Sequence, residues 1–180
     1  MANFLLFASL YMLFPVLPAV IVSRLGISTV QVGSMFLVFA VGMFLVGPFH
    51  AYLGDAYKRK HVLVYSTFIM LAATVGYLFA DTLTKLLLLA VVQGGAFGLA
   101  ATAGITVAID ITNSPHRSAG NMTYALAARL GMLVGVGVGI WMLQLKGFSM
   151  VVYLSALCGI FSILFALRVY VAFRAPIGIG

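Results

Sequence analysis

Acidic residues are nearly absent from this chain. Its 180 residues include three aspartates and no glutamate, against ten lysines and arginines, and charged residues make up only 7% of the total. Hydrophobic residues make up 64%, and the mean hydropathy is +1.20. So few polar side chains cannot cover the surface of a soluble domain of this length, which excludes a soluble globular protein. The composition indicates an integral membrane protein.

Cysteine and metal ligands are scarce as well. The single cysteine, Cys158, lies in an apolar run and cannot form a disulfide within the chain, so we interpret it as a packing residue. Metal sites usually have ligands at short, fixed spacings. No such pair occurs among the polar residues that gather toward one side of the predicted membrane, namely His50, Asp55, His61, Asp110 and His116. We therefore predict no metal, no cofactor, no catalytic residue and no enzymatic activity.

Long apolar runs dominate the chain instead. A helix needs about 20 apolar residues to cross the hydrocarbon core of a bilayer. Six segments joined by short gaps meet this requirement: 2–23, 30–52, 62–80, 86–109, 118–143 and 148–172. The first is too long for the apolar region of a signal peptide and lacks a basic segment before it, so we interpret it as a span. We predict an all-α membrane protein with six transmembrane helices.

Two of these segments begin with recognisable helix signals. Ser28 and Gln31 have the spacing of a capping box at the start of the second span. Ser114-Pro115 combines an N-cap residue with a first-turn proline at the start of the fifth. Both signals support the division of the chain into six helices.

The basic residues predict the orientation. Six of them lie on one side of the membrane: Lys58, Arg59, Lys60, Arg117, Arg168 and Arg174. Three lie on the other side, Arg24, Lys85 and Lys146, and Arg129 lies within a span. Lysine and arginine accumulate on the cytoplasmic side of membrane proteins, so we expect both termini in the cytoplasm. The net charge of +7 largely restates this asymmetry and requires no nucleic acid partner.

The densest cluster of charge lies in residues 47–61, GPFHAYLGDAYKRKH. A lysine or arginine at the centre of a membrane costs about 2.5 to 3.5 kcal/mol, so this segment must contain a turn between two spans. Gly54 is the residue expected to end the preceding helix, because glycine reaches the left-handed conformation without a steric cost.

This turn resembles the connection between the second and third helices of the major facilitator superfamily of secondary transporters, which reads roughly G-x-L-A-D-R-x-G-R-R. Four residues of this sequence match that pattern, namely Leu53, Asp55, Arg59 and Lys60. The departures include Ala51 and Lys58 in place of glycine and Ala56 in place of a basic residue. Gln93-Gly94 is similar to the fourth-helix pattern R-x-x-Q-G-x-G-x-A of the same family. Ala90 stands where that pattern has an arginine associated with proton coupling.

The resemblance implies a function and a domain organisation. Residues 1–174 would be the N-terminal six-helix half of a transporter, built as a 3+3 inverted repeat, and residues 175–180 would begin the linker to a second six-helix half. Its partners would be that half, membrane lipid and a small polar or anionic solute. The solute would be carried across a cell membrane, by inference the bacterial inner membrane, by secondary active transport with alternating access.

The resemblance also implies a cytoplasmic gate formed by Asp55, Arg59, Lys60 and Asp110. In the family, the aspartate that matches Asp55 caps a helix of the other half, where a helix N-terminus favours a carboxylate. The last basic residues of the turn pair with an acid at the end of the fourth helix. Here that would join Arg59 or Lys60 to Asp110.

Arg129 is the single residue that most strongly indicates a functional site. It lies about 11 residues into a span of about 26, near the middle of the membrane. An arginine there is costly against lipid and almost always faces a bundle interior or a water-filled cavity. We interpret it as an anchor for an anionic or polar solute, the alternative being a buried structural arginine bonded to carbonyl groups.

Three further polar residues are candidates for the solute cavity. Tyr11 lies near Pro15 and Pro18, whose expected kink would let the first helix line a pathway. Gln93 and Thr102 lie in the fourth span. The alternative for Gln93 is an interhelical packing bond.

Glycines repeat at four-residue intervals in two spans, a pattern that lets membrane helices approach closely. Gly94 and Gly98 begin one such ladder, and Gly131, Gly135 and Gly139 form the other. We expect both ladders to be packing faces.

His50 is the one candidate for a proton site within a span, because the three aspartates all lie at span ends. The alternative is a neutral interfacial histidine. We expect any proton carrier to belong to the other half, unless the protein is a uniporter.

Two other functions remain open. A complete six-span protein could dimerise into a pore or transporter, and a membrane-bound metalloenzyme would use the histidines and aspartates on the cytoplasmic side. The sequence does not distinguish uptake from efflux.

Overall fold

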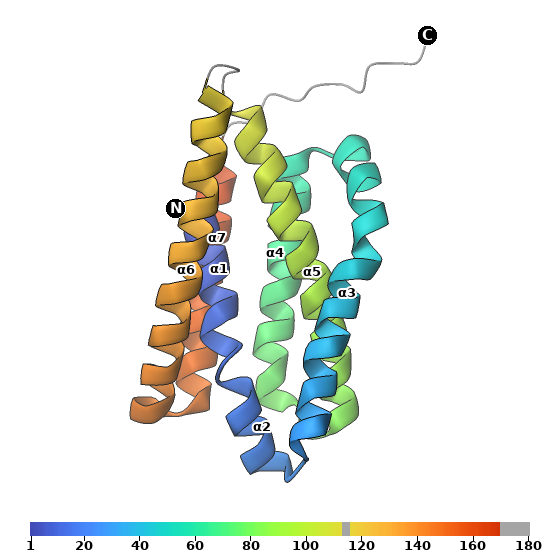
Figure 1. The fold of residues 1–180 in the computed structure, drawn as a ribbon, viewed down its shortest axis with the longest axis vertical. Helices are drawn as coiled ribbons and strands as arrows, with labels where there is room; N and C mark the ends of the chain where they lie inside the picture. The colour runs from blue at the N-terminus through green and yellow to red at the C-terminus, as the bar shows by residue number, and fades with distance from the viewer. Residues whose placement is uncertain (113–115, 170–180) are drawn as a thin grey trace.

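Helices joined by short connections make up the part of the chain that the structure describes. The computed structural model describes residues 1–112 and 116–169, without the side chains of residues 51, 54–56 and 117. Its elements are α1 (Ala2–Leu13), α2 (Leu17–Leu25), α3 (Thr29–Ala56), α4 (Arg59–Gly76), the 3₁₀ helix η1 (Tyr77–Phe79), α5 (Leu83–Asp110), α6 (Arg117–Lys146) and α7 (Phe148–Arg168) (Figure 1). Neither described range contains a strand, and the predicted all-α fold is confirmed.

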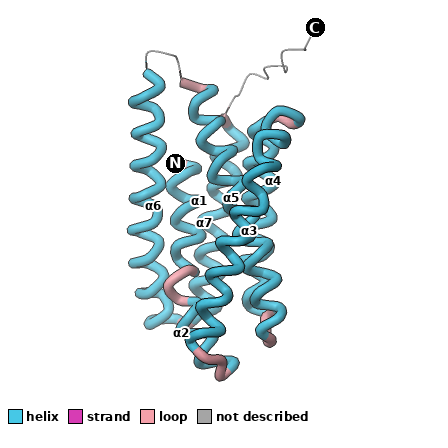
Figure 2. The backbone as a smooth tube through the Cα atoms, turned by 45° about the vertical axis from the view of Figure 1, so that its right-hand side comes forward, coloured by secondary structure: helices cyan, strands magenta, loops and turns pink. Residues whose placement is uncertain are grey.

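Within the described residues, six helical segments are long and apolar enough to cross a membrane. They are Ala2–Leu25, Thr29–His50, Arg59–Phe79, Leu83–Asp110, Ser118–Lys146 and Phe148–Arg168. Each corresponds to one predicted span, so the prediction of a six-span membrane protein is confirmed. Figure 2 shows these helices running along the long axis of the bundle.

The first span is broken into two helices. α1 ends at Leu13, and α2 begins at Leu17 with Pro18 in its first turn. A proline removes a backbone donor, and its ring clashes with the carbonyl four residues earlier. The two prolines, Pro15 and Pro18, therefore account for the break between α1 and α2 that Figure 1 shows.

The capping box at the start of α3 is confirmed. The Ser28 Oγ accepts a hydrogen bond from the Gln31 N–H at 3.4 Å, and the Gln31 Oε1 accepts one from the Ser28 N–H at 2.9 Å. Two backbone donors at the helix start are thereby satisfied. The predicted start of the fifth span, at Ser114-Pro115, lies outside the described residues.

The predicted end of α3 at Gly54 is wrong. The helix continues through Gly54 to Ala56 and ends at Tyr57, where φ is −123° and ψ is 158°. An extended residue ends a helix without the left-handed turn for which glycine is needed. That turn occurs instead at Gly26, which follows α2 with φ of 63°.

The first three spans and the last three spans make equivalent helix contacts. α1 packs on α6 and α7, and α5 packs in the corresponding way on α3 and α4. α4 and α7 pack on each other, and in Figure 1 they lie behind the other helices. The exchange replaces α1 by α5, α3 by α6 and α4 by α7, which is the pairing of a 3+3 inverted repeat.

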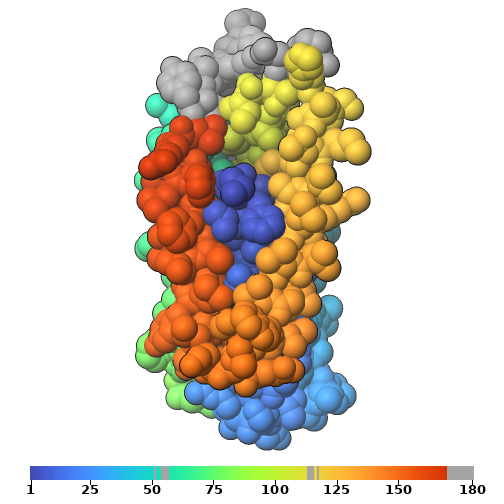
Figure 3. Space-filling view, turned by 90° about the vertical axis from the view of Figure 1, so that its left-hand side faces the viewer, coloured from blue at the N-terminus to red at the C-terminus, as the bar shows by residue number. Residues whose placement is uncertain are grey.

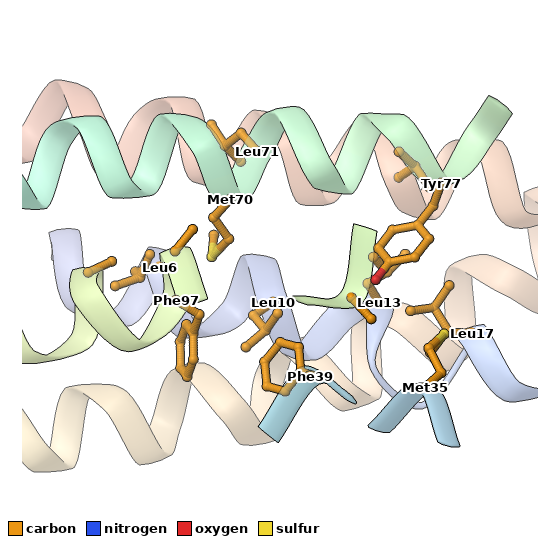
Figure 4. Packing of buried hydrophobic residues seen from close by; sticks show 14 of the residues in the cluster. Leu6, Leu10, Leu13, Leu17, Met35, Phe39, Met70, Leu71, Tyr77 and Phe97 are labelled. Carbon is orange, nitrogen blue, oxygen red and sulfur yellow. The ribbon is translucent and has the colours of Figure 1, made fainter. Parts of the chain in front are cut away.

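α1 lies at the centre of the packing. Its Leu6, Leu10 and Leu13 are almost fully buried. Around them Figure 4 shows Met70 of α4 and Phe39 of α3, among other apolar side chains. Ser9 of α1 and Ser155 of α7 are also buried, and each hydroxyl donates to the other residue's carbonyl oxygen, at 2.8 Å and 2.6 Å. These bonds satisfy polar groups that lipid could not satisfy.

Glycines allow the two closest helix pairs to approach. On α6, Gly131, Gly135 and Gly139 lie against the α1 backbone at Phe4, Ala8 and Met12, one after another. On α5, Gly94 lies against the α3 backbone at Phe39, and Gly98 against Met43. A side chain at most of these glycines would overlap the backbone of the facing helix, so both ladders lie in helix interfaces.

Candidate functional site

The predicted gate residues Arg59 and Asp110 are brought together at one end of the bundle. We call this the basic end, and it holds the connection between α3 and α4, the connection between α5 and α6, and the end of α7. The Arg59 Nη1 donates to both carboxylate oxygens of Asp110, at 2.8 Å and 3.0 Å. Their side chains are 37% and 18% exposed.

Helix ends explain why these two charges pair. Arg59 is the first residue of α4 and Asp110 is the last residue of α5. A cation at a helix N-terminus and an anion at a C-terminus are both unfavourable toward their own helix dipole. Each charge therefore opposes its own helix and is compensated by the other, which ties the two helix ends together.

Lys60 takes a different partner. Its Nζ donates to the carbonyl oxygens of Leu167 and Val169, at 2.6 Å and 2.8 Å. These carbonyls belong to the C-terminal end of α7, where a cation is favourable. Of the two basic residues that the resemblance left open as partners of Asp110, the structure pairs Arg59. The side chain of Asp55, the fourth gate residue, lies outside the described part of the chain.

Arg129 is exposed and forms no hydrogen bond or ion pair with the described residues. Its neighbours along the helix are exposed too: Met122 by 76%, Leu126 by 55% and Leu133 by 71%. At 100° per residue it lies about 180° around α6 from Val138, which packs against a buried cluster that includes Val151 of α7. Arg129 therefore lies on a side of α6 that the described helices leave uncovered.

Gln93 forms interhelical hydrogen bonds, which was the alternative to its predicted role in the solute cavity. It is 1% exposed. Its Oε1 accepts from the Tyr77 hydroxyl at 3.1 Å, and its Nε2 donates to the Thr74 Oγ1 at 3.0 Å. The side chain thus joins α5 to α4 and η1, and the described residues bury it almost completely.

Thr102 and His50 share a cavity of about 150 Å³ between α3 and α5. The Thr102 hydroxyl donates to the Gly98 carbonyl within its own helix, at 2.8 Å. His50 is partly exposed. The four predicted cavity residues, Tyr11, Gln93, Thr102 and Arg129, therefore do not share one site within this half.

A second cavity, of about 390 Å³, lies at the basic end and has Lys60 in its lining. Figure 3 shows the surface hollowed between α6 and α7, with α1 at the bottom of the hollow. None of the predicted solute-binding residues lines this cavity.

A group of aromatic rings is the feature that the sequence interpretation missed. Six rings are in contact: Phe7 and Tyr11 of α1, Phe14 directly after α1, Phe36 and Phe39 of α3, and Phe97 of α5. The spacing of seven residues between Phe7 and Phe14, with Tyr11 between them, places these three rings on one helix face, because Phe14 keeps helical backbone angles as the C-cap of α1. This spacing, which is visible in the sequence, could have predicted the aromatic group.

The described residues contain no group of three or more histidine, cysteine, aspartate or glutamate side chains able to bind a metal ion.

The six spans, the inverted repeat and the paired charges at the basic end define the half bundle of a multi-pass membrane transporter fold. A family model described as Major Facilitator Superfamily matches residues 1–177. The chain belongs to this superfamily, which is a family of transporters rather than enzymes.

The individual proteins to which the chain is similar are distant relatives. The chain is 25% identical over 144 residues to proteins named "Quinolone resistance protein NorA" from Staphylococcus aureus strains MRSA252, Mu50 / ATCC 700699 and N315. The match covers 79% of this chain and 37% of each relative. The chain thus matches little more than a third of the length of these relatives.

Proposed function

We propose that this chain is the N-terminal half of a secondary active transporter that moves a small polar or anionic solute by alternating access. Membership of the superfamily supports transport, and the greater length of the relatives supports a second six-helix half as its partner. The relatives' name adds quinolones to the solutes to be tried.

Arg129 is the observation on which the choice of solute depends. A permanently charged guanidinium within a span needs a polar or anionic partner, and none of the described residues supplies one. A solute held between the halves would meet the uncovered side of α6. Arg129 would then bind its anionic group with charge-assisted hydrogen bonds.

Replacing Arg129 with glutamine is expected to reduce transport by at least about tenfold, because a hydrogen bond to a charged group contributes about 1.5 to 3 kcal/mol. The protein that contains this chain would be reconstituted in vesicles, and flux of a radiolabelled quinolone and of labelled succinate would be measured.

Arg24→Gln is the matched control, since Arg24 lies at the end of α2, stacked on Phe148 at 5.6 Å. Its flux should remain near that of the unmodified protein. Undiminished flux in the Arg129 variant would rule out the anchor, and absence of flux for every probe would rule against transport of this solute class.

The cytoplasmic gate is part of the same proposal. We propose that the Arg59–Asp110 pair holds α4 to α5 in one state of the transport cycle and weakens in another, with Asp55 and Lys60 acting at the same end. The double charge reversal described in the Discussion tests this pair.

We also propose that the basic end faces the cytoplasm of a bacterial cell. Cysteine introduced at Lys58 is expected to react only with reagents that cross the membrane, whereas cysteine at Lys146 should react with impermeant maleimide added outside. Replacing Cys158 by serine first removes the native thiol. Labelling of Lys58→Cys from outside, with Lys146→Cys protected, would reverse the orientation.

A further inference from the structure

The aromatic group has a buried base and a partly open rim. Phe39 and Phe97 are 8% and 5% exposed, whereas Phe7, Tyr11, Phe14 and Phe36 are only partly buried. The rings form a continuous series. Its contacts include Phe7 with Phe97 at 5.2 Å, Phe14 with Phe36 at 4.8 Å, and Phe14 with Phe39 at 5.2 Å between ring centroids. The open rim is therefore supported by rings that are themselves fixed by packing.

The rim lies on the side of α1 that faces away from α7. At 100° per residue, Tyr11 lies about 160° around α1 from Ser9, whose hydroxyl bonds to α7. It lies only about 60° from Ala8, whose backbone meets α6 at Gly135. Figure 1 shows α1 flanked by α6 on one side and by α5 and α3 on the other, with α4 and α7 behind. We call the open rim of Phe7, Tyr11, Phe14 and Phe36 the aromatic face.

Arg129 lies beside this face, displaced toward the basic end. The packing of Gly131 on Phe4 and of Gly135 on Ala8 sets the register of α6 against α1. In that register Arg129 is five residues nearer the basic end than Phe7, or about 8 Å at 1.5 Å per residue. An extended arginine side chain can span much of that distance. A flat ring on Phe7 and Tyr11 could therefore place an anionic substituent at the guanidinium.

The charges of this half favour an anion over a cation. Aromatic ring faces attract cations as well as other rings, so the rings alone do not decide the sign of a ligand. The described carboxylates are already paired, Asp110 with Arg59 and Asp81 with Lys85 at 2.6 Å. Arg129 has no described partner. The charge available beside the aromatic face is positive.

We propose that the solute is a planar aromatic anion, with its ring on the aromatic face and its carboxylate bound by Arg129. This inference rests on the proposed transport function and narrows its solute class. Packing alone would account for Phe39 and Phe97 but leaves the partly open rings of Phe7, Tyr11 and Phe14, which share one helix face, unexplained. Stacked and edge-on contacts favour an aromatic ring over a saturated one of the same size.

Binding of three probes to the purified protein that contains this chain tests the proposal by calorimetry in detergent. The probes are 2-naphthoate, its saturated analogue decahydro-2-naphthoate, and the cation 2-naphthylmethylammonium. We expect 2-naphthoate to bind at least tenfold more tightly than either of the others. Arg129→Gln should remove the preference for the anion, and Tyr11→Leu should reduce the preference for the aromatic ring severalfold while keeping the preference for the anion.

Three control variants separate these effects from damage to the fold. Tyr65→Leu changes a tyrosine of α4 that is 66% exposed and whose ring contacts His61 rather than the aromatic face. Arg24→Gln removes a cation at the other end of the bundle. Both variants should bind 2-naphthoate as the unmodified protein does. Tyr11→Phe keeps the ring and should bind normally, which shows that the leucine variant fails for want of an aromatic ring.

The outcomes distinguish this inference from the proposed function. Equal binding of 2-naphthoate and its saturated analogue would refute the aromatic class, and equal binding of the cation would refute the charge assignment. Transport of succinate without binding of 2-naphthoate would leave the proposed function standing and overturn this inference. Neither binding nor transport of any anion would overturn both.

Discussion

Replacing Gly139 with leucine is expected to prevent the bundle from folding. A Cβ at this position would overlap the Met12 backbone of α1, and neither backbone can move away without separating α6 from the central helix. Overpacking in a well-packed interior typically costs about 1 to 3 kcal/mol, and more where backbone must shift. Because α6 packs on α1 at two further glycines, Gly131 and Gly135, the disturbance would extend along the whole interface.

Gly137 supplies a matched control. It lies two residues away on the same helix, and a Cβ there would meet nothing within 4 Å. Gly137→Leu makes the same chemical change on an uncovered surface, so it should leave the yield and melting temperature nearly unchanged. Size-exclusion chromatography and thermal unfolding of both detergent-purified variants would provide the comparison. Equal behaviour of the two variants would show that the close approach of α1 and α6 is absent from the protein.

The elements that depend on local sequence were predictable. A membrane span is a run of about 20 apolar residues, so all six were visible without any tertiary information. The capping box of Ser28 and Gln31 spans four residues and is likewise local. Which residue ends a helix is less local. Gly54 can end a helix but is not obliged to, and α3 continues to Ala56.

Side-chain partners were less predictable because they depend on the rotation of each helix about its axis. A glutamine within a span must find hydrogen bonds, but the sequence cannot say whether Gln93 faces a cavity or Thr74 and Tyr77 on the neighbouring helix. The pairing of Asp110 came from family resemblance, which left two basic partners open. Only the position of the α7 end explains why Lys60 is engaged there and Arg59 reaches Asp110.

The aromatic face illustrates the same limit. The spacing of Phe7, Tyr11 and Phe14 predicts a single helix face but not whether that face is buried. In the structure, α7 packs on the opposite side of α1, and the rings meet α3 and α5 along one edge. Whether an apolar stripe is exposed therefore depends on how the helices are arranged, which the spacing of residues along one helix cannot predict.

Reversing both charges of the Arg59–Asp110 pair is expected to restore the stability that either single reversal removes. Asp110→Arg alone would place two arginines at the contact now spanned by the 2.8 Å bond. Because this contact is partly exposed, the expected loss is modest, about 1 to 2 kcal/mol from the broken pair and the new repulsion.

The double variant Arg59→Asp with Asp110→Arg restores the attraction. It also places an acid at the N-terminus of α4 and a base at the C-terminus of α5, where each is favoured by its helix dipole by about 0.3 to 1 kcal/mol. Its melting temperature should therefore equal or exceed that of the unmodified protein. If the pair must also weaken during transport, the double variant should carry its solute more slowly despite this stability, with little change in solute affinity. A double variant no more stable than the weaker single variant would show that the two side chains do not pair, and one with unchanged flux would remove the pair from the proposed gate.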